Sequence, residues 1–335
     1  MSGEPGPEGL EREAALFREA ADAVRAEVGK AFLGSPQTVE AVLASVLAGG
    51  HVLLEGVPGL GKTLLVRTLA RVLGLSYARV QCTPDLLPAD VLGTTVLAEG
   101  AGGARELRFQ EGPVFANLLL VDEINRATPR TQSALLEAMQ EGAVTAGGTS
   151  RPLPDPFLVL ATENPVEMEG TYPLPEAELD RFLVKLLLAP PGRDALEEIV
   201  RATTGQAGPA PSAVLDAGRV RGLRAGVRRV HLPGPALRWI ADLTLLTQPG
   251  RPGAPAAVER FVRWGAGPRA AQALALLARA TALLDGRWNA SFEDARAHAA
   301  SVLRHRLVLS FEAEAEGVTA DAVVAKVLEA AGPGR

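Results

Sequence analysis

The chain has 335 residues, of which 34 are basic and 39 acidic, and its formal charge of -5 disfavours a surface that binds polyanions in general. With 47% apolar and 22% charged residues, the composition excludes intrinsic disorder and suits a globular protein of about two domains. Cys82 is the one cysteine, so it cannot form an intrachain disulfide, and no stretch resembles a secretory signal or a membrane span; we expect a cytoplasmic protein without membrane insertion.

The N-terminal part predicts helices around one buried strand. Gly and Pro dominate residues 1–9, and apolar side chains then recur at helical spacing as far as residue 32. Gly49 and Gly50 are typical of a helix end. The elements expected in chain order are a lead and helix over 1–30, a helix over 38–47, a short buried strand over 51–55 and a helix over 62–73.

Short apolar runs and helical stretches then alternate. The runs lie at residues 77–80, 118–121, 157–161 and 182–188, and the clearest helical stretches at 131–141 and 176–181. This alternation predicts an α/β fold with a parallel sheet covered by helices on both faces. The segment 83–116 is too long for a plain loop, so we expect a functional elaboration there.

Beyond the Ala-Pro-Pro-Gly stretch at 189–192, the pattern changes to helices alone. Examples are residues 271–284 and 292–309, and a Gly/Pro-rich connection lies at 248–255. We therefore expect an αβα core over 31–190 and an all-helical second domain over 191–335.

Residues 56–63 read GVPGLGKT and match the phosphate-binding pattern G-x-x-x-x-G-K-[ST] between a strand and a helix. In such a loop backbone N–H groups surround phosphate oxygens, Lys62 neutralises phosphate charge and Thr63 binds Mg²⁺. No lysine stands in the [NT]-K-x-D segment of many GTPases, which favours ATP. The expected nucleotide contacts are Gly56, Val57, Pro58, Gly59, Leu60, Gly61, Lys62, Thr63 and Leu64.

Two later strands end in polar residues. The apolar run 118–121 leads into Asp122 and Glu123, and the run 157–161 leads toward Asn164. Parallel strands deliver such side chains to the sheet edge where ligands bind. Asp122 is expected to hold Mg²⁺, Glu123 to polarise the attacking water, and Asn164 to sense the γ-phosphate and that water.

In order and spacing these motifs resemble an AAA+ ATPase, and in detail the chain is similar to the MoxR family. The match is carried by HVLLEGVPGLGKT (51–63), FQEGPVFANLLLVDEINRATPRTQSALLEAMQEG (109–142), ATENPVEMEGTYPLPEAELDRF (161–182), GPRA (267–270) and VLRHRLVLSFEAEAEGVTAD (302–321). The resemblance implies a five-stranded αβα core, a helical lid, and ATP bound between them in a hexameric ring. It also implies a helix-2 insert at 83–116 and a hairpin at 141–156, both facing the pore or a partner.

The same resemblance assigns two arginines. Arg181 in LDRF is implied to be the arginine finger given to the neighbouring subunit, and Arg269 in GPRA the sensor-2 arginine acting from the lid. A cation against the developing γ-phosphate charge accelerates transfer strongly. The family often has SPRA, a change that keeps the arginine, while the preceding segment 248–264 is unusually rich in Pro and Gly.

Other polar and aromatic residues fit structural roles. His298 and His305 are seven positions apart, a spacing unlike helical metal pairs, so we assign no protein metal site. Trp239, Trp264 and Trp288 are expected to be packing anchors. The acidic run 312–316 is expected to be a solvated helix end.

These observations favour an Mg²⁺-dependent ring ATPase that remodels or activates a client protein. The resemblance implies a partner with a von Willebrand factor A domain. The alternatives are a magnesium-chelatase-type motor subunit, a scaffold that binds ATP with little turnover, and a nucleic-acid motor. The last is disfavoured because residues 141–156 hold one basic side chain, Arg151, and the insert only Arg105 and Arg108.

Overall fold

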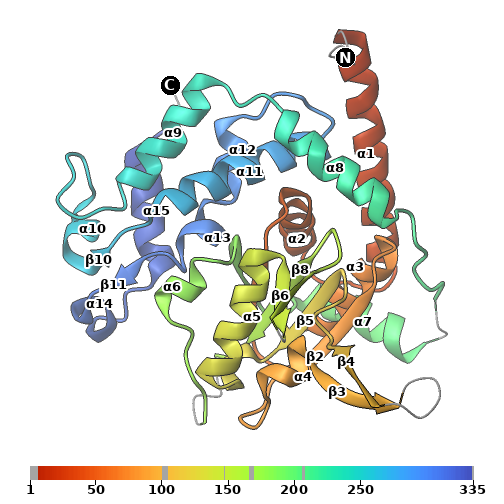
Figure 1. Ribbon diagram of the computed structural model, residues 1–335. Coiled ribbons are helices and arrows are strands. Elements are labelled where there is room, and N and C mark those ends of the chain that lie inside the picture. Colours follow the sequence, from red (N-terminus) through yellow and green to blue (C-terminus); the bar gives the residue numbers. More distant parts are fainter. Residues whose placement is uncertain (1–6, 100–104, 147, 166–169, 206–207, 334–335) are drawn as a thin grey trace.

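The computed structural model describes residues 7–99, 105–146, 148–165, 170–205 and 208–333 (Figure 1). The predicted lead before residue 7, the tip of the insert and part of the 161–182 motif thus lie outside the described residues. In the part described, a central sheet is partly enclosed by an arch of helices from the C-terminal half.

The central sheet has five parallel strands, which confirms the predicted α/β class. In spatial order the strands are β2 (Tyr77–Gln81), β5 (Leu118–Asp122), β8 (Leu158–Glu163), β1 (Val52–Glu55) and β9 (Val184–Leu187). Because β1, β5 and β8 are adjacent, the segments that follow them meet at one edge of the sheet.

Alternate side chains of the strands feed two separate cores. Leu54 and Leu120 join a cluster with helices α2 (Pro36–Ala48) and α3 (Lys62–Val72), whereas Leu53 and Leu119 pack with α5 (Pro129–Glu141) on the other face. Since successive strand residues point to opposite faces, continuous apolar runs are what a sheet buried on both sides requires. Helices therefore cover both faces, as predicted.

The helices that follow the sheet, here called the lid, share an apolar cluster with it. They are α7 (Arg193–Thr204), α8 (Ala217–Arg229), α9 (Gly234–Leu245), α10 (Ala256–Phe261), α11 (Pro268–Leu284), α12 (Phe292–Ala297), α13 (Ala299–Leu303), α14 (Phe311–Ala315) and α15 (Ala320–Ala331). Leu274 and Leu277 of α11 belong to the same apolar cluster as Leu54 and α2. The N-terminal helix α1 (Pro7–Gly29) contributes Val24 to it. The boundary at residue 190 stays a prediction.

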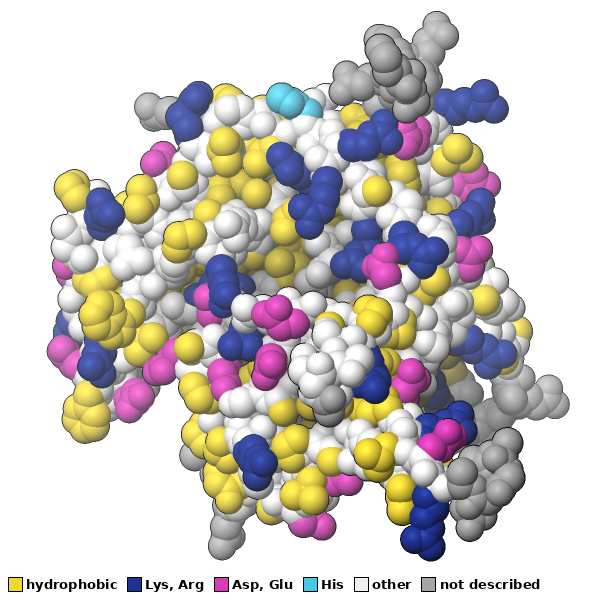
Figure 2. Space-filling model, viewed as in Figure 1, with side chains coloured by type: hydrophobic (Ala, Val, Ile, Leu, Met, Phe, Trp, Pro, Cys, Tyr) yellow, Lys and Arg dark blue, Asp and Glu magenta, His cyan; other side chains and the backbone are white. Residues whose placement is uncertain are grey.

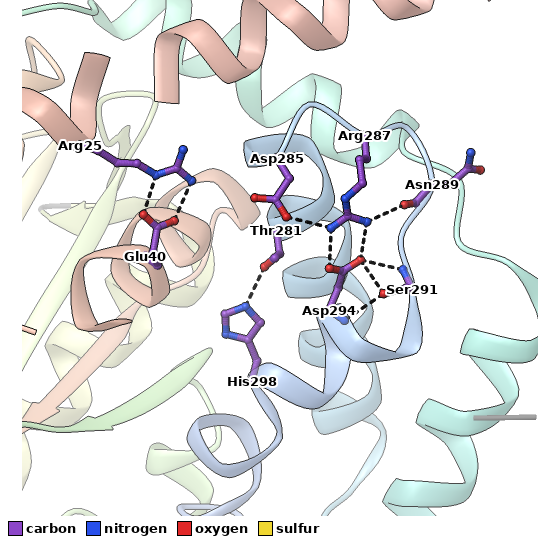
Figure 3. A network of polar contacts seen from close by, with 9 residues as sticks. All are labelled: Arg25, Glu40, Thr281, Asp285, Arg287, Asn289, Ser291, Asp294 and His298. Atoms are coloured by element: carbon purple, nitrogen blue, oxygen red, sulfur yellow. Dashed lines mark hydrogen bonds and ion pairs between the residues drawn. The ribbon is translucent and has the colours of Figure 1, made fainter. Parts of the chain in front are cut away.

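Polar contacts fix the lid internally and α1 against α2 (Figure 3). Arg287 donates to Asp294 at 2.7 and 3.0 Å, and His298 Nε2 lies 2.8 Å from Thr281 Oγ1. Arg25 of α1 and Glu40 of α2 form a bidentate pair at 2.6 and 2.8 Å.

The prediction of an all-helical second domain is wrong in one detail. Strands β10 (Val262–Trp264) and β11 (Val308–Leu309) pair antiparallel, and the helix predicted over 292–309 is interrupted at His298 and ends at Leu303. His298 has φ −101° and ψ −1°, which breaks the helical hydrogen-bond ladder. After a turn at 304–306, the chain pairs with β10 through the two residues of β11.

The tryptophans and the acidic run differ partly from expectation. Trp239 is buried and confirms its packing role, and half-buried Trp288 stacks edge-on against Phe17 at 5.9 Å. Trp264 is 63% exposed, so its predicted role as a packing anchor is wrong. The acidic run is not simply solvated, because Arg260 forms ion pairs with Glu312 and Glu316.

Two antiparallel hairpins extend from the sheet domain (Figure 1). Within the segment 83–116, the helix α4 (Pro88–Leu92) leads into strands β3 (Gly93–Glu99) and β4 (Arg105–Glu111). The hairpin expected over 141–156 is present as β6 (Ala143–Ala146) and β7 (Thr149–Pro152). The Arg151 guanidinium lies 4.1 Å from the centre of the Phe109 ring, so the two hairpins touch.

The described residues contain neither a membrane-spanning helix nor a metal-binding cluster. None of their helices combines the length and the apolar character that crossing a bilayer demands. No cluster of three or more His, Cys, Asp or Glu side chains suited to a metal ion occurs among them. His298 and His305 are both buried.

Candidate active site

The loop between β1 and α3 has the backbone of a phosphate cradle. Gly59 and Gly61 have φ of 87° and 77°, a region that disfavours side chains, so glycine is required there. Gly56 N–H donates to Glu163 O at 3.2 Å, which ties the start of the loop to the end of β8. No side chain caps the N-terminus of α3, so its first N–H groups remain free to bind an anion.

Lys62 is folded back against this loop. Its Nζ donates to Gly56 O at 2.6 Å and to Glu163 O at 3.3 Å. Burial lowers the pKa of Lys62, while Asp122 and Glu123 act in the opposite direction. An ammonium held only by carbonyl groups is well placed to exchange them for phosphate oxygens.

Asp122 lies at the end of β5 with both carboxylate oxygens engaged. Thr162 Oγ1 donates to Oδ1 at 2.7 Å, and Thr63 Oγ1 approaches Oδ2 at 3.4 Å. Thr63 and Asp122 thus bring together the oxygen ligands that Mg²⁺ prefers, which fits the predicted metal. Thr162 was missed from the sequence, although its position directly after an apolar strand was a usable signal.

Glu123 is the one non-glycine residue with positive φ, 55°, in the part of the chain that the structure describes. Its N–H donates to Thr162 Oγ1 at 2.8 Å. Its carboxylate accepts hydrogen bonds from Gln81 Nε2 at 3.0 Å and Arg126 at 3.1 Å. Gln81, at the end of the neighbouring strand β2, was also missed because its role depends on strand order.

Asn164 follows β8 directly and is buried. Since β8 pairs with both β5 and β1, Asn164 lies at the same sheet edge as the glycine-rich loop and the Asp122–Glu123 pair. The structure therefore brings these predicted residues together, which is the arrangement needed to hold a triphosphate and a water molecule.

Arg181 and Arg269 lie elsewhere. Leu183 N–H donates to His51 O, so Arg181 precedes β9 at the amino edge of the sheet. Strand β1 has four residues and spans about 13 Å, with the glycine-rich loop at its other end. Arg269 pairs with Asp180 at 3.3 Å, next to Arg181.

A second arginine holds Asp180 from the lid. Arg306 donates to Asp180 Oδ1 at 2.8 Å and to Phe182 O at 2.7 Å, and its side chain is 3% exposed. Burial lowers the pKa of Arg306, while Asp180 acts in the opposite direction. No sequence pattern pointed to a role for Arg306, because a lone arginine after a helix is not distinctive.

A pocket of about 670 Å³ opens beside the glycine-rich loop. It is lined by Gly59, Leu60, Gly61 and Leu64, by residues 30–38, by residues 187–192 and by one side of α7. The size and the largely apolar lining suit a nucleotide base. Val57 is half-buried and Pro58 exposed in the same loop.

Comparisons with known proteins cover both the sheet and the lid. The family described as ATPase family associated with various cellular activities (AAA) matches residues 51–184, and AAA lid domain matches 255–327. Chaperone MoxR1 of Mycobacterium tuberculosis is 41% identical over 90% of this chain and 79% of its own length. Protein MoxR of Paracoccus denitrificans is 37% identical over 88% of this chain and 89% of its own length.

A crystal structure of a Cytophaga hutchinsonii protein assigned as an ATPase matches with a TM-score of 0.88 and 39% identity, covering 95% of this chain and 96% of that one. The sequence similarity and the fold thus extend over nearly the whole chain. The protein belongs to the MoxR family of AAA+ ATPases.

Proposed function

We propose that this ATPase works with Mg²⁺ as a subunit of a hexameric ring and uses ATP turnover to remodel or activate a client protein. The observation that carries the proposal is the division of the predicted site between two sheet edges. Lys62, Asp122, Glu123 and Asn164 share the carboxyl edge, and Arg181 stands at the amino edge. A complete site then needs the edges of two copies.

At the carboxyl edge each residue has a distinct proposed task. Thr63 and Asp122 would hold Mg²⁺, which when bound offsets the charge of the β- and γ-phosphates. Lys62 exchanges the carbonyl of Gly56 for a phosphate oxygen. Glu123 orients and polarises the attacking water, and the buried Asn164 amide positions it.

At the amino edge we propose that Arg181 serves the nucleotide of the neighbouring copy. Its guanidinium makes no hydrogen bond or ion pair with another side chain in the described ranges, and it borders a small polar pocket with Glu137 and Glu178. Arg269 lies beside it through Asp180. We therefore propose that Arg269 also acts on the neighbour rather than on its own nucleotide.

Mixing inactive variants tests this arrangement. Lys62→Ala and Arg181→Ala are each expected to abolish turnover, because one spoils the loop and the other the donated cation. In random mixed rings, about a quarter of the interfaces join an intact loop to an intact arginine, so the mixture regains up to about a quarter of the wild-type rate. A mixture as inactive as its components contradicts action between copies.

We propose that the client contacts the two hairpins. Leu97 and Leu107 face each other across β3 and β4 and are 60% and 75% exposed, an apolar pair that solvent does not favour. The partner with a von Willebrand factor A domain follows from the family resemblance alone, and the cytoplasmic location stays a prediction.

The alternatives have distinguishing tests. The described strand β4 carries Arg105 and Arg108 but also Glu106 and Glu111, and Figure 2 shows basic and acidic side chains interspersed on the visible face. This disfavours a nucleic-acid motor, which stimulation by single-stranded DNA would revive. Reconstitution with a porphyrin-binding partner separates a chelatase-type motor. ATP binding without turnover indicates a scaffold.

A further inference from the structure

The side chain of Arg79 is hydrogen-bonded to the carboxylate of Asp122. Arg79 lies on the edge strand β2, and its Nε and Nη2 donate to Asp122 Oδ2 at 3.1 and 2.7 Å. Both bonds end on the same oxygen, and the Thr63 hydroxyl also lies 3.4 Å from it. A positive charge therefore sits beside the oxygen that faces the proposed metal ligand Thr63.

The other oxygen of Asp122 is fixed independently. Thr162 Oγ1 donates to Oδ1 at 2.7 Å, so the carboxylate keeps its orientation whether or not Arg79 is present. The Asp122 side chain is only 11% exposed. An acid so placed needs a counter-charge, and the guanidinium supplies it.

Arg79 itself is free to leave. Its side chain is 47% exposed, in contrast to the 3% of Arg306. Among the described residues, its other side-chain hydrogen bond runs from Nη2 to Gln81 Oε1 on the same strand, at 2.8 Å. Water can replace Asp122 as the hydrogen-bond partner of such a half-exposed guanidinium at a small cost in free energy. The contact with Asp122 is thus one that an incoming cation can replace.

We propose that Arg79 is a positioning residue that stands in for Mg²⁺ on Asp122 and yields to it when metal and nucleotide bind together. This inference rests on the proposed metal role of Thr63 and Asp122. In the metal-free site Arg79 cancels the negative charge that would repel a triphosphate. In the metal-loaded site the ion has to displace Arg79, which weakens the gain from metal binding.

If Arg79 competes with Mg²⁺ for Asp122, it weakens the coupling between metal binding and nucleotide binding. Removing Arg79 leaves the negative charge of Asp122 uncompensated, so nucleotide without metal binds more weakly. It also removes the group that competes with Mg²⁺ for Asp122, so nucleotide with Mg²⁺ binds as well or better. The ratio of the affinity in Mg²⁺ to the affinity without metal should therefore rise about tenfold, which is the scale of one lost charged hydrogen bond. A merely structural role for Arg79 would lower both affinities together.

The test is equilibrium binding of a non-hydrolysable ATP analogue by calorimetry to the full chain, in Mg²⁺ and in EDTA. Arg79→Ala and Arg79→Gln should both raise the ratio, and Arg79→Lys should keep it near the wild-type value. In an Asp122→Asn background, Arg79→Ala should leave the ratio unchanged. Arg71→Ala, which removes an exposed arginine of the nearby α3, is the matched control and should change neither affinity.

An unchanged ratio in Arg79→Ala and Arg79→Gln overturns the inference, whether both affinities persist or both fall by the same factor. These outcomes differ from a failure of the proposed function. If the wild-type chain binds the analogue equally in Mg²⁺ and EDTA and Asp122→Asn changes nothing, then the metal role of Asp122 itself is wrong.

Discussion

At Glu123 an unusual backbone and a catalytic assignment coincide. Its φ of 55° lies in the left-handed region, and the strain is held by the Thr162 hydroxyl on one side and the buried Ile124 on the other. Residues kept in such conformations cluster at functional sites. The carboxylate is thereby held against Gln81 and Arg126.

Replacing Glu123 by Gln should separate binding from chemistry. The amide keeps the size of the side chain but cannot polarise water, so we expect turnover to fall at least about a hundredfold while nucleotide binding persists. Phosphate release and calorimetric titration measure the two properties. Glu293→Gln, an exposed change on α12, is the control. Turnover that is unchanged in Glu123→Gln contradicts the assigned role.

Among elements, polar contacts just after α13 add to the apolar packing that holds the lid against the sheet. Arg304 donates to Lys185 O at 2.9 Å and Arg306 to Phe182 O at 2.7 Å, so the turn after α13 is bound to the segment at β9. Because Asp180 is held by both Arg306 and Arg269, the position of Arg181 depends on the lid.

Arg306→Gln should therefore loosen the lid. Losing a buried guanidinium leaves Asp180 and the Phe182 carbonyl poorly satisfied, which should lower the free energy of unfolding by about 3 kcal/mol. Arg296→Ala, at an exposed position of α12, should change it by less than about 0.5 kcal/mol. Urea unfolding followed by circular dichroism measures both. Equal stability of the two variants would show that the contacts of Arg306 are dispensable.

The sequence predicted the long elements and missed the short ones. Apolar runs such as 118–121 and helices such as 131–141 carry enough residues to show a period. The strands β10 and β11 have three and two residues, too few for any pattern, and their pairing joins segments far apart in the chain. The break at His298 has no Gly or Pro to signal it.

For the whole molecule, the motif residues could be predicted but not their distribution in space. The loop 56–63, Asp122, Glu123 and Asn164 follow strands, so their common edge follows from parallel pairing. Arg79 and Gln81 were missed because their contacts depend on β2 lying next to β5. The amino-edge position of Arg269 depends on how the lid packs, which local sequence does not encode.

Buried histidines make the stability of the whole chain depend on pH. Burial lowers the pKa of His51 and of His298 to about 4 and that of His305 well below its ordinary value. In the unfolded chain these histidines have a pKa near 6.5, so as the pH falls they bind protons that they do not bind in the folded chain. Stability is therefore full above pH 6.5 and falls as the pH drops toward 4.

The decrease should reach about 1.4 kcal/mol per pH unit for each histidine. Urea unfolding at pH 7.5 and pH 5.5 measures it, in a range where most carboxylates stay ionised. His298→Gln should lessen the slope without removing it. A free energy of unfolding that is the same at both pH values would show that the histidines are not buried in neutral form.

The separation of Arg181 and Arg269 from the loop at 56–63 also determines how many complete sites an assembly contains. If both arginines serve the next copy, a lone copy has no complete site, and an open row always has one fewer complete site than copies, with an unserved loop at one end and idle arginines at the other. Joining the two ends adds a site without adding a subunit. The catalytic output of each copy would then report directly on whether the circle is closed.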